Sequence, residues 1–475
     1  MMTKGNTFLM NWKMTLYRSA RRAAVPVLLA LATVVWTGGE LQSQSPVDCR
    51  TRSGVDKQVC VVSGRITSDT TFDSGSYWVL RGAVFVEDGA TLTLDAGTEV
   101  FGEFATNGTL IIAQGAQIHS NGTATAPVVF SSDQEVGGRA RADWGGLIIN
   151  GRAPLNVPGG TSVGEGDTGV YGGSDPDDDS GHLRYTRVEF AGTEFSPDNE
   201  LNGIAFQGVG RETEVEYVQV SFNKDDGMEF FGGTVEVKHV ICYGIADDSY
   251  DWTDGWQGKG QFMIALQSGD DADQGIEADN NGDNRTLTPR SNPTLYNLTL
   301  LGDPDTDAGS ESDTGILLRE GTSVTLRNFI VHGFKEASID IDHGETYRQI
   351  TDSTTDTPLT IESGIVNGNC VVSGCDGEFR PDSDDMVNNQ SLKDWIAAQP
   401  NVTTATDPKL MDPFNLGNPN FSPAIDSPAT SGAVTPATPP NDGFFDTSAT
   451  FIGAVGPAGS GHDTWWMGWT NFAVN

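Results

Sequence analysis

Positive charge is scarce in this sequence of 475 residues: 28 lysines and arginines stand against 65 aspartates and glutamates, for a formal net charge of −37. Phosphate backbones bind to surfaces rich in lysine and arginine, so this deficit excludes a nucleic-acid-binding protein. Runs of Ala, Leu, Glu and Lys are also rare, and Asp, which favours turns, outnumbers Glu, which favours helices, by about two to one. An all-helical protein is therefore not expected.

Cysteine is equally scarce, with five residues, and none of their spacings matches a zinc-binding motif. Cys49 lies close in sequence to Cys60, and Cys370 to Cys375, so an exported chain would form two short-loop disulfides. Cys242 lies within an apolar string and is expected to be a buried structural thiol rather than a reactive one.

Long hydrophobic runs are absent except at 23–36, where an apolar segment follows several basic residues. This segment has the length of a signal-peptide core and is too short to span a bilayer comfortably. Residues 1–45 are therefore predicted to be a secretory signal, with an uncleaved anchor as the alternative. We expect a secreted protein, at the cell surface or free outside the cell, with no transmembrane span in the mature chain.

Glycine, by contrast, is abundant, with 58 residues, and the hydrophobic fraction of 37% is too high for a disordered acidic chain. The length exceeds one ordinary compact core, so several domains or one elongated repeat fold are expected. Weak internal repeats favour the repeat fold. Two glycine-broken pairs of short strands, at 89–100 and 108–118, lie about 18 residues apart with no helix between them.

A second repeat, alternating apolar residues that mostly end in Gly or Asn, recurs further along the chain. It occurs at 188–192, 220–223, 240–244, 298–302 and 329–333. Alternation places one face of each strand inside, and short strands without helical crossovers are typical of a solenoid. The sequence thus predicts an all-β fold, a right-handed parallel β-helix with about 20 residues per rung. An array of β-sandwiches is the alternative, but the hairpin turns that it needs are not evident.

These repeats divide the chain into four parts. A cap region with the Cys49–Cys60 disulfide is expected at 46–80, after the signal, and the β-helix with acidic loop insertions at 81–380. Residues 381–475 are expected to hold a helix at 391–398, an extended Pro-rich strap at 423–440 and a Trp-rich C-terminal cap at 465–469. The cap is expected because a solenoid must cover the apolar residues of its last rung.

Several segments resemble a large group of exported bacterial β-helix proteins with the pectate-lyase-like superfold, many of them described as surface proteins or lipoproteins. The segments are 82–92, 126–132, 143–151, 225–235, 247–258 and 451–472. The resemblance implies a right-handed β-helix and export, and it implies no assigned function. This chain lacks the lipid-attachment cysteine of the lipoprotein members, because the residues before Cys49 are not the small ones required.

Asp175, Asp177 and Asp179 form the first candidate metal site. Alternating carboxylates before a glycine turn can wrap a hard cation such as calcium. A complete calcium loop would also have a bidentate glutamate, and the expected position is Thr186. A solvated acidic turn is therefore an equal alternative.

The second candidate consists of two acidic pairs, Asp225-Asp226 and Asp247-Asp248, which lie one predicted rung apart. Stacked carboxylates repel one another, so they need a raised pKa or a bound cation. Two interpretations stay open: calcium bound between the rungs, or paired acids that cleave a polysaccharide. Further aspartates at 270–273, 279–283 and 303–307 are expected in loops, more often as solvated turns than as calcium sites.

The sequence lacks several of the motifs that the enzymatic interpretation would require. Segments 223–225 and 247–248 resemble acidic motifs of polygalacturonase-like β-helix enzymes, but the Gly-His-Gly of that family is represented only by His332 and Gly333. Its Arg-x-Lys clamp has no match. A β-elimination lyase would need a basic residue near calcium, for which Lys224 and Arg187 are the candidates.

These features predict an exported structural or binding β-helix protein of the cell surface or extracellular matrix. Calcium is the expected cofactor, and polysaccharides or other surface proteins are the expected partners. Self-assembly into homo-oligomers or fibres through the solenoid ends is a further expectation. The alternative is a polysaccharide lyase or glycoside hydrolase that acts on a β-helix face.

Overall fold

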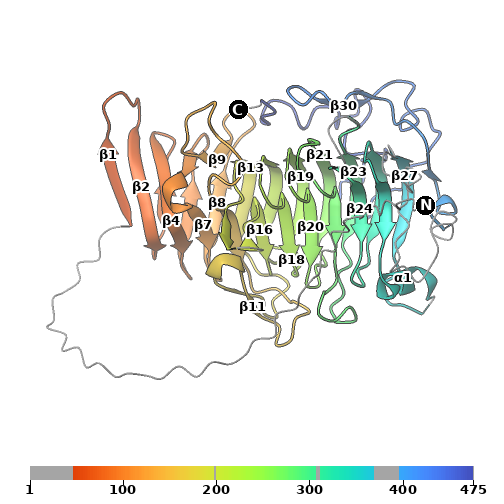
Figure 1. Cartoon of the computed structure of the whole chain (residues 1–475), viewed down its shortest axis with the longest axis horizontal. Coiled ribbons are helices and arrows are strands. Elements are labelled where there is room, and N and C mark those ends of the chain that lie inside the picture. The colour runs from red at the N-terminus through yellow and green to blue at the C-terminus, as the bar shows by residue number, and fades with distance from the viewer. Residues whose placement is uncertain (1–45, 197–198, 306–310, 353, 369–394, 474–475) are drawn as a thin grey trace, which may run out of the picture. The chain divides into compact units, whose positions relative to one another are not determined.

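The computed structural model describes residues 46–196, 199–305, 311–352, 354–368 and 395–473. The predicted signal at 1–45, the predicted Cys370–Cys375 disulfide and the first half of the predicted helix at 391–398 lie outside these residues. The described residues form one compact unit, in which successive rungs of β-strands stack side by side (Figure 1).

Within the described residues, the main sheet contains 24 strands. They are β1 (Val47–Thr51), β2 (Gln58–Ile66), β3 (Thr70–Phe72), β4 (Ser76–Val86), β5 (Thr91–Leu94), β6 (Glu99–Gly102), β7 (Thr109–Ile112), β8 (Gln117–Asn121), β9 (Val128–Ser132), β10 (Gly146–Asn150), β13 (Gly181–Glu189), β16 (Ile204–Gln207), β17 (Glu214–Ser221), β18 (Met228–Phe231), β19 (Glu236–Tyr243), β20 (Tyr250–Thr253), β21 (Lys259–Leu266), β22 (Ile276–Ala278), β23 (Thr294–Leu301), β24 (Thr314–Leu318), β25 (Thr325–His332), β26 (Ala337–Ile341), β27 (Thr360–Asn367) and β28 (Val402–Thr403).

Smaller elements lie outside this sheet. They are the strand pairs β11 (Ser162–Val163) with β12 (Val170–Tyr171), β14 (Glu194–Ser196) with β15 (Asn199–Glu200) and β29 (Leu410–Asp412) with β30 (Asn420–Pro423), the 3-10 turns η1 (Phe104–Thr106) and η2 (Glu165–Asp167), and the helix α1 (Gly344–Thr351).

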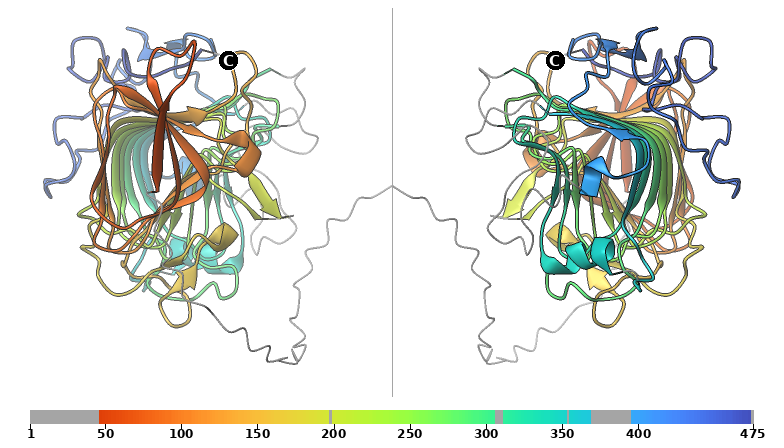
Figure 2. Two further views of the ribbon diagram at one scale, coloured as in Figure 1. Left: turned by 90° about the vertical axis from the view of Figure 1, so that its left-hand side faces the viewer. Right: turned by 90° about the vertical axis from the view of Figure 1, so that its right-hand side faces the viewer.

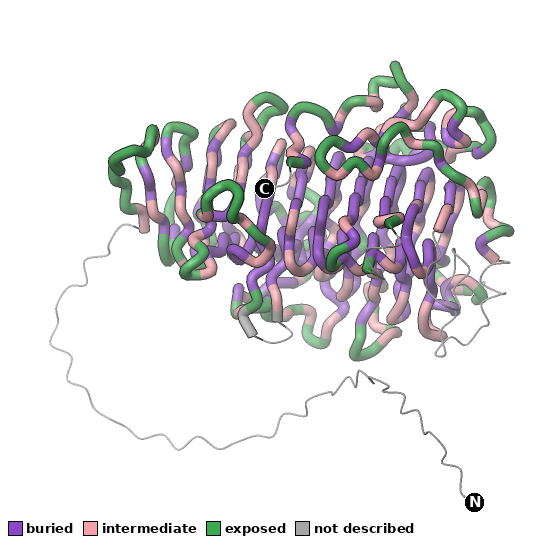
Figure 3. The backbone as a smooth tube through the Cα atoms, turned by 45° about the horizontal axis from the view of Figure 1, so that its top comes forward, coloured by how far each residue is buried: buried purple, intermediate pink, exposed green. Residues whose placement is uncertain are grey.

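Parallel pairing between successive rungs makes the fold a right-handed parallel β-helix, which confirms the prediction from the repeats. Strands β17, β19, β21, β23, β25 and β27 pair in one continuous parallel series, and β16, β18, β20, β22, β24 and β26 pair in another. Viewed end on, the rungs enclose one common interior (Figure 2). Buried residues lie mainly along the strands, and exposed ones mainly in the loops that connect them (Figure 3).

Apolar side chains in equivalent positions stack inside the coil. Phe206 lies 5.2 Å from Phe230 between ring centroids, and Phe230 lies 4.1 Å from Trp256. Each rung buries its apolar side chains against the next one, so no rung can be stable alone. Cys242 is completely buried in this interior, as predicted.

Each long strand turns a corner at one residue in the left-handed backbone conformation. These residues occupy equivalent positions and have φ between 45° and 60°: Tyr185, Tyr217, His239, Phe262, Asn297, Asn328 and Ser363. The corner lets one strand pair with two different strands of the preceding rung. β13 pairs with β8 before its corner residue and with β9 after it. Their side chains form a column on which other parts of the chain can pack.

The N-terminal end of the β-helix carries a covalent link. β1 pairs with β2 in antiparallel fashion, and the Cys49–Cys60 disulfide joins the two strands, as predicted. β2 already pairs in parallel with β4, so the coil begins before residue 81, where the repeat pattern had placed its start. The predicted boundary at residue 81 followed the glycine-broken repeat, and that repeat begins only after β2 and β4.

The C-terminal part of the chain runs along one side of the β-helix. The strap predicted at 423–440 is part of this longer segment, and from here we use the name strap for all of residues 404–473. Asn328 donates a hydrogen bond to Ala437 O, Asn297 to Phe451 O and Gln219 to Asn471 O, each at 2.8 Å. The strap therefore passes from late rungs back to the middle ones (Figure 1).

The predicted cap at 465–469 is wrong in its placement. Trp466 and Trp469 belong to a buried cluster with Ile241 and Leu266, which face outward from the middle rungs. The apolar outer faces of these rungs need a cover, and the tryptophans provide it. The last rung is covered instead by the segment that contains Trp395, Ile396 and Val402, which packs on the main core.

The sequence pattern also missed a helix. The segment 391–398 was the one helix expected, and its described part is helical at 395–397. In addition, α1 forms in the insertion between β26 and β27, where Tyr347 is buried against the core. A helix of eight residues depends on such packing rather than on its own propensity. Among the described residues, no helix is long and apolar enough to cross a membrane.

Candidate metal centre

The acidic pairs lie in equivalent turns of two adjacent rungs. Strand β18 pairs with β20 so that Met228 is opposite Tyr250, which places Asp225 beside Asp247 and Asp226 beside Asp248. Asp248 N–H donates a hydrogen bond to Asp226 Oδ1 at 3.1 Å. The stacking predicted from the 22-residue offset is therefore confirmed.

A glycine makes this close approach possible. Gly227 follows the first acidic pair, and a Cβ atom there would lie 2.7 Å from Cys242 Sγ and 2.6 Å from Ser249 O. Such contacts are too short for any residue with a side chain. The Asp-Asp-Gly turn therefore lies directly against the next rung, with its carboxylates near those of the neighbouring turn.

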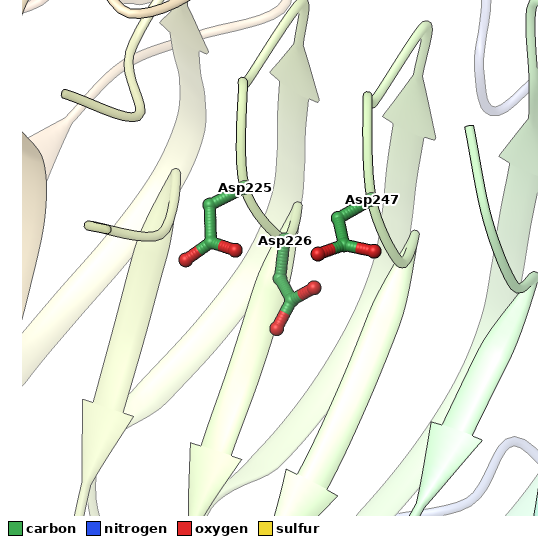
Figure 4. Close-up of side chains that lie close together, drawn as sticks. All are labelled: Asp225, Asp226 and Asp247. Atoms are coloured by element: carbon green, nitrogen blue, oxygen red, sulfur yellow. The ribbon is translucent and has the colours of Figure 1, made fainter. Parts of the chain in front are cut away.

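Three overlapping groups of carboxylates result, and within each group one oxygen per residue lies within 4.8 Å of the others. Asp225, Asp226 and Asp247 form the first group (Figure 4). Asp226 and Asp248 form the second with Asp251, and Asp247 and Asp248 the third with Asp273. We call these six aspartates the acidic cluster. Every ligand atom that it offers is a carboxylate oxygen, the donor type preferred by calcium.

Asp251 follows the second acidic pair closely in the sequence but was not among the predicted metal ligands. It lies in β20 between the inward-facing Tyr250 and Trp252, so its side chain faces outward beside Asp248. In register it stands between Glu229 of β18 and Glu277 of β22, which makes a row of three carboxylates. The alternation of apolar residues combined with the 22-residue offset would have placed Asp251 beside Glu229, but not beside Glu277, which follows 26 residues later. Asp273, expected as a loop residue, also joins the cluster.

Burial and mutual repulsion make these carboxyl groups hard to ionise. Burial, and then the neighbouring Asp247, raise the pKa of Asp225 to about 7. Burial, and then Asp273, raise the pKa of Asp247 to about 6. The pKa values of Asp226, Asp248 and Asp251 rise well above the ordinary value, mainly through burial and secondly through adjacent carboxylates. The cluster must therefore hold protons or cations at neutral pH.

The nearest basic groups pair with other acids. Lys224 Nζ lies 2.7 Å from Asp271 Oδ2, at the exposed edge. Arg319 pairs with Glu277 and, at 2.9 Å, with Asp279, both outside the six aspartates. These contacts leave charge in the cluster for a cation to balance.

The first predicted site has a different arrangement. Asp175 Oδ1 accepts a hydrogen bond from Asp177 N–H, Asp177 pairs with Arg211 at 2.9 Å, and Asp179 accepts from Gly181 N–H at 2.8 Å. None of these three aspartates belongs to the carboxylate groups found among the described residues. Their side chains stabilise their own turn and an ion pair, so they do not converge as a calcium site requires.

The residues considered for catalysis are also dispersed. Arg187 donates to Trp469 O of the strap, and His332 packs on Phe414, so both lie under the strap rather than beside the aspartates. Lys224 is adjacent to Asp225 in the chain but is paired with Asp271. The side chains of Asp226 and Asp248 are almost fully buried, which leaves no room for a sugar ring between them.

The comparison with protein families agrees with this architecture. The family model described as pectate-lyase like beta helix domain matches residues 64–376. None of the curated proteins matches the sequence. Among solved structures, the crystal structure of the Dettilon tailspike protein (gp208) is similar at 13% identity and a TM-score of 0.20. The match covers 73% of this chain and 62% of that one, so this chain spans less than two thirds of the tailspike chain.

Proposed function

We propose that this chain, which belongs to the pectate-lyase-like β-helix family, is an exported structural or binding protein stabilised by calcium. Its place of action would be the cell surface or the extracellular matrix. The Cys49–Cys60 disulfide supports export, since disulfides persist in oxidising compartments.

The observation that carries the proposal is the acidic cluster between adjacent rungs. Five of its aspartates come from three turns and Asp251 comes from β20. Burial and repulsion raise the pKa values of Asp225, Asp226, Asp247, Asp248 and Asp251. Calcium takes six to eight oxygen ligands in flexible geometry, whereas zinc favours nitrogen and sulfur. A calcium ion between the rungs would be bound by carboxylates of both. It would replace their mutual repulsion by an attraction that holds neighbouring rungs together.

Calorimetric melting with calcium and with chelator tests the proposal. Calcium should raise the melting temperature, because a ligand at about 100 times its Kd stabilises the native state by about 2.7 kcal/mol. Asp248→Asn should remove the response to calcium. Without calcium it should melt no lower than the wild type, because the substitution also removes repulsion.

Asp177→Asn is the matched control, since Asp177 lies in another acidic turn outside the cluster. This variant should respond to calcium as the wild type does. An identical melting temperature of the wild type with calcium and with chelator would refute the calcium role.

Polysaccharide cleavage is the second candidate function, and the raised pKa of Asp225 favours it. A carboxyl group with a pKa of about 7 in a half-buried turn could act as a general acid at neutral pH. Screening acidic and neutral glycans for reducing ends or unsaturated products tests this. Activity that persists in both Asp225→Asn and Asp248→Asn would exclude the cluster as the active site.

A further inference from the structure

The strap covers a defined outer surface of the middle and late rungs. Two columns of outward-facing residues form this surface, and each column continues in register from rung to rung. The first is Arg187, Gln219, Ile241, Ile264, Thr299, Ile330 and Ile365. The second is Glu189, Ser221, Tyr243, Leu266, Leu301, His332 and Asn367. Apolar members of both columns are buried by strap residues.

Side chains of this surface hold the strap chiefly by its backbone. Gln219 donates to Asn471 O, Lys238 to Phe444 O and Asn297 to Phe451 O. Aromatic residues of the strap pack beside the columns, as Trp469 does against the corner residues Tyr185 and Tyr217, at 5.9 and 6.0 Å between ring centroids. The surface therefore recognises an extended, aromatic peptide that crosses the strands.

The same two columns continue into the early rungs. Arg187 is in register with Val129, and then with Glu99 and Tyr77. The second column continues, after Glu189, as Ser131, Phe101, Val79 and Val61. Strap residues up to Asn471 bind no further than the rung of Arg187 and Glu189.

In place of the strap, the early rungs present a groove. It has a volume of about 440 Å³, and Val61, Val79, Tyr77 and Phe101 form much of its wall. All four are half-buried. The Phe101 ring meets the Tyr77 ring edge-on at 5.8 Å. We call this the N-terminal groove.

Hydrogen-bond donors line the N-terminal groove as they line the strap surface. Arg52, Arg81 and Arg139 are part of its wall, and the Arg139 guanidinium lies 5.8 Å from the Phe101 ring. Glu99, Glu103 and Asp133 are also part of it, so the groove is locally balanced in a chain of net charge −37. An apolar floor, aromatic residues and polar donors are thus common to the groove and to the surface under the strap.

We propose that the N-terminal groove binds an extended, aromatic-containing peptide segment of a partner protein, laid across the strands in line with the strap. The peptide would offer backbone carbonyls to Arg52 and aromatic side chains to the space around Val79 and Phe101. This inference rests on the proposed binding role and adds the chemistry of the partner. It is independent of calcium, because the groove contains none of the six aspartates.

The experiment uses a fluorescent peptide that copies residues 463–473 of the strap, titrated with the full chain in the presence of chelator. Saturable binding is expected, and Val79→Lys should weaken it at least about tenfold. Phe101→Lys is the second variant, and thermal melting identifies which of the two is folded. Thr93→Lys is the control. Thr93 is half-buried in β5, away from the groove, so this variant should bind like the wild type.

Three results would overturn the proposal. The first is no saturable binding to the wild type. The second is equal binding to the wild type and the folded groove variants, since the peptide would then bind elsewhere, such as the surface of its own strap. The third is a wild-type dimer in sedimentation velocity that Val79→Lys dissociates, because a second copy would then occupy the groove. Chelator keeps these outcomes separate from the calcium test.

Discussion

At the scale of single residues, charge balance in the acidic cluster decides how the protein responds to its surroundings. Asp225 has a pKa of about 7 and Asp247 of about 6 in the folded chain, against about 3.9 for an unfolded aspartate. The native state therefore binds more protons than the unfolded state between these values. Stability from these groups is complete below pH 4 and is lost as the pH rises through 6 and 7.

We accordingly predict that the calcium-free protein loses stability between about pH 5 and pH 8, the reverse of the usual behaviour of a paired carboxylate. Calcium should abolish most of this loss, because the ion replaces the protons. Urea unfolding at several pH values, with calcium and with chelator, measures both effects. A chelated protein whose stability rises over this interval would contradict the shifted pKa values.

At the scale of elements, the strap ties many rungs together. Trp469 is almost fully buried, and its indole N–H donates to Trp465 O at 2.9 Å. Trp469→Ala should lower the free energy of unfolding by about 3–5 kcal/mol, the usual cost of removing a large buried aromatic side chain. Met467→Ala, at a side chain 44% exposed in the same segment, should change it by less than about 0.5 kcal/mol.

Urea unfolding of the two variants measures this difference. Equal free energies of unfolding for Trp469→Ala and Met467→Ala would mean that packing of the strap on the β-helix adds no stability. A separate early transition in Trp469→Ala would show in addition that the strap couples the rungs into one cooperative unit, since repeats otherwise interact only with their neighbours.

The elements also show what the sequence can predict. Alternating apolar residues identify strands such as β19 and β23, and the 22-residue offset places Asp226 beside Asp248, because register follows directly from a repeat. α1 could not be found this way, since its helix depends on burial of Tyr347. The strap has no repeat of its own, and its path depends on outer faces such as that of Ile241, which periodicity alone does not distinguish from inner ones.

At the scale of the whole molecule, part of the excess negative charge is concentrated at one place along the β-helix. Carboxylates gather in the turns before β18, β20 and β22, where consecutive rungs place them side by side. A solenoid transmits stability from neighbour to neighbour, so repulsion at one such junction weakens the whole stack. A cation at the junction would therefore act as a joint between the earlier and the later rungs.

Self-assembly through the solenoid ends stays a prediction at this scale. Among the described strands, β1 pairs with β2 alone, and four of its five residues are exposed. The charged Asp48 and Arg50 on this strand would have to pair with a second chain. Static light scattering over rising concentration measures association, and a constant mass of one chain would contradict it.

The central claim is that a cation joins adjacent rungs at the acidic cluster. A crystal structure of the chain grown with calcium, with anomalous differences measured at long wavelength, tests it most directly. We predict an anomalous peak among the carboxylates of Asp226, Asp248 and Asp251, with oxygen ligands at about 2.3–2.6 Å. Carboxylates in direct hydrogen bonds with one another, without such a peak at saturating calcium, would contradict the account.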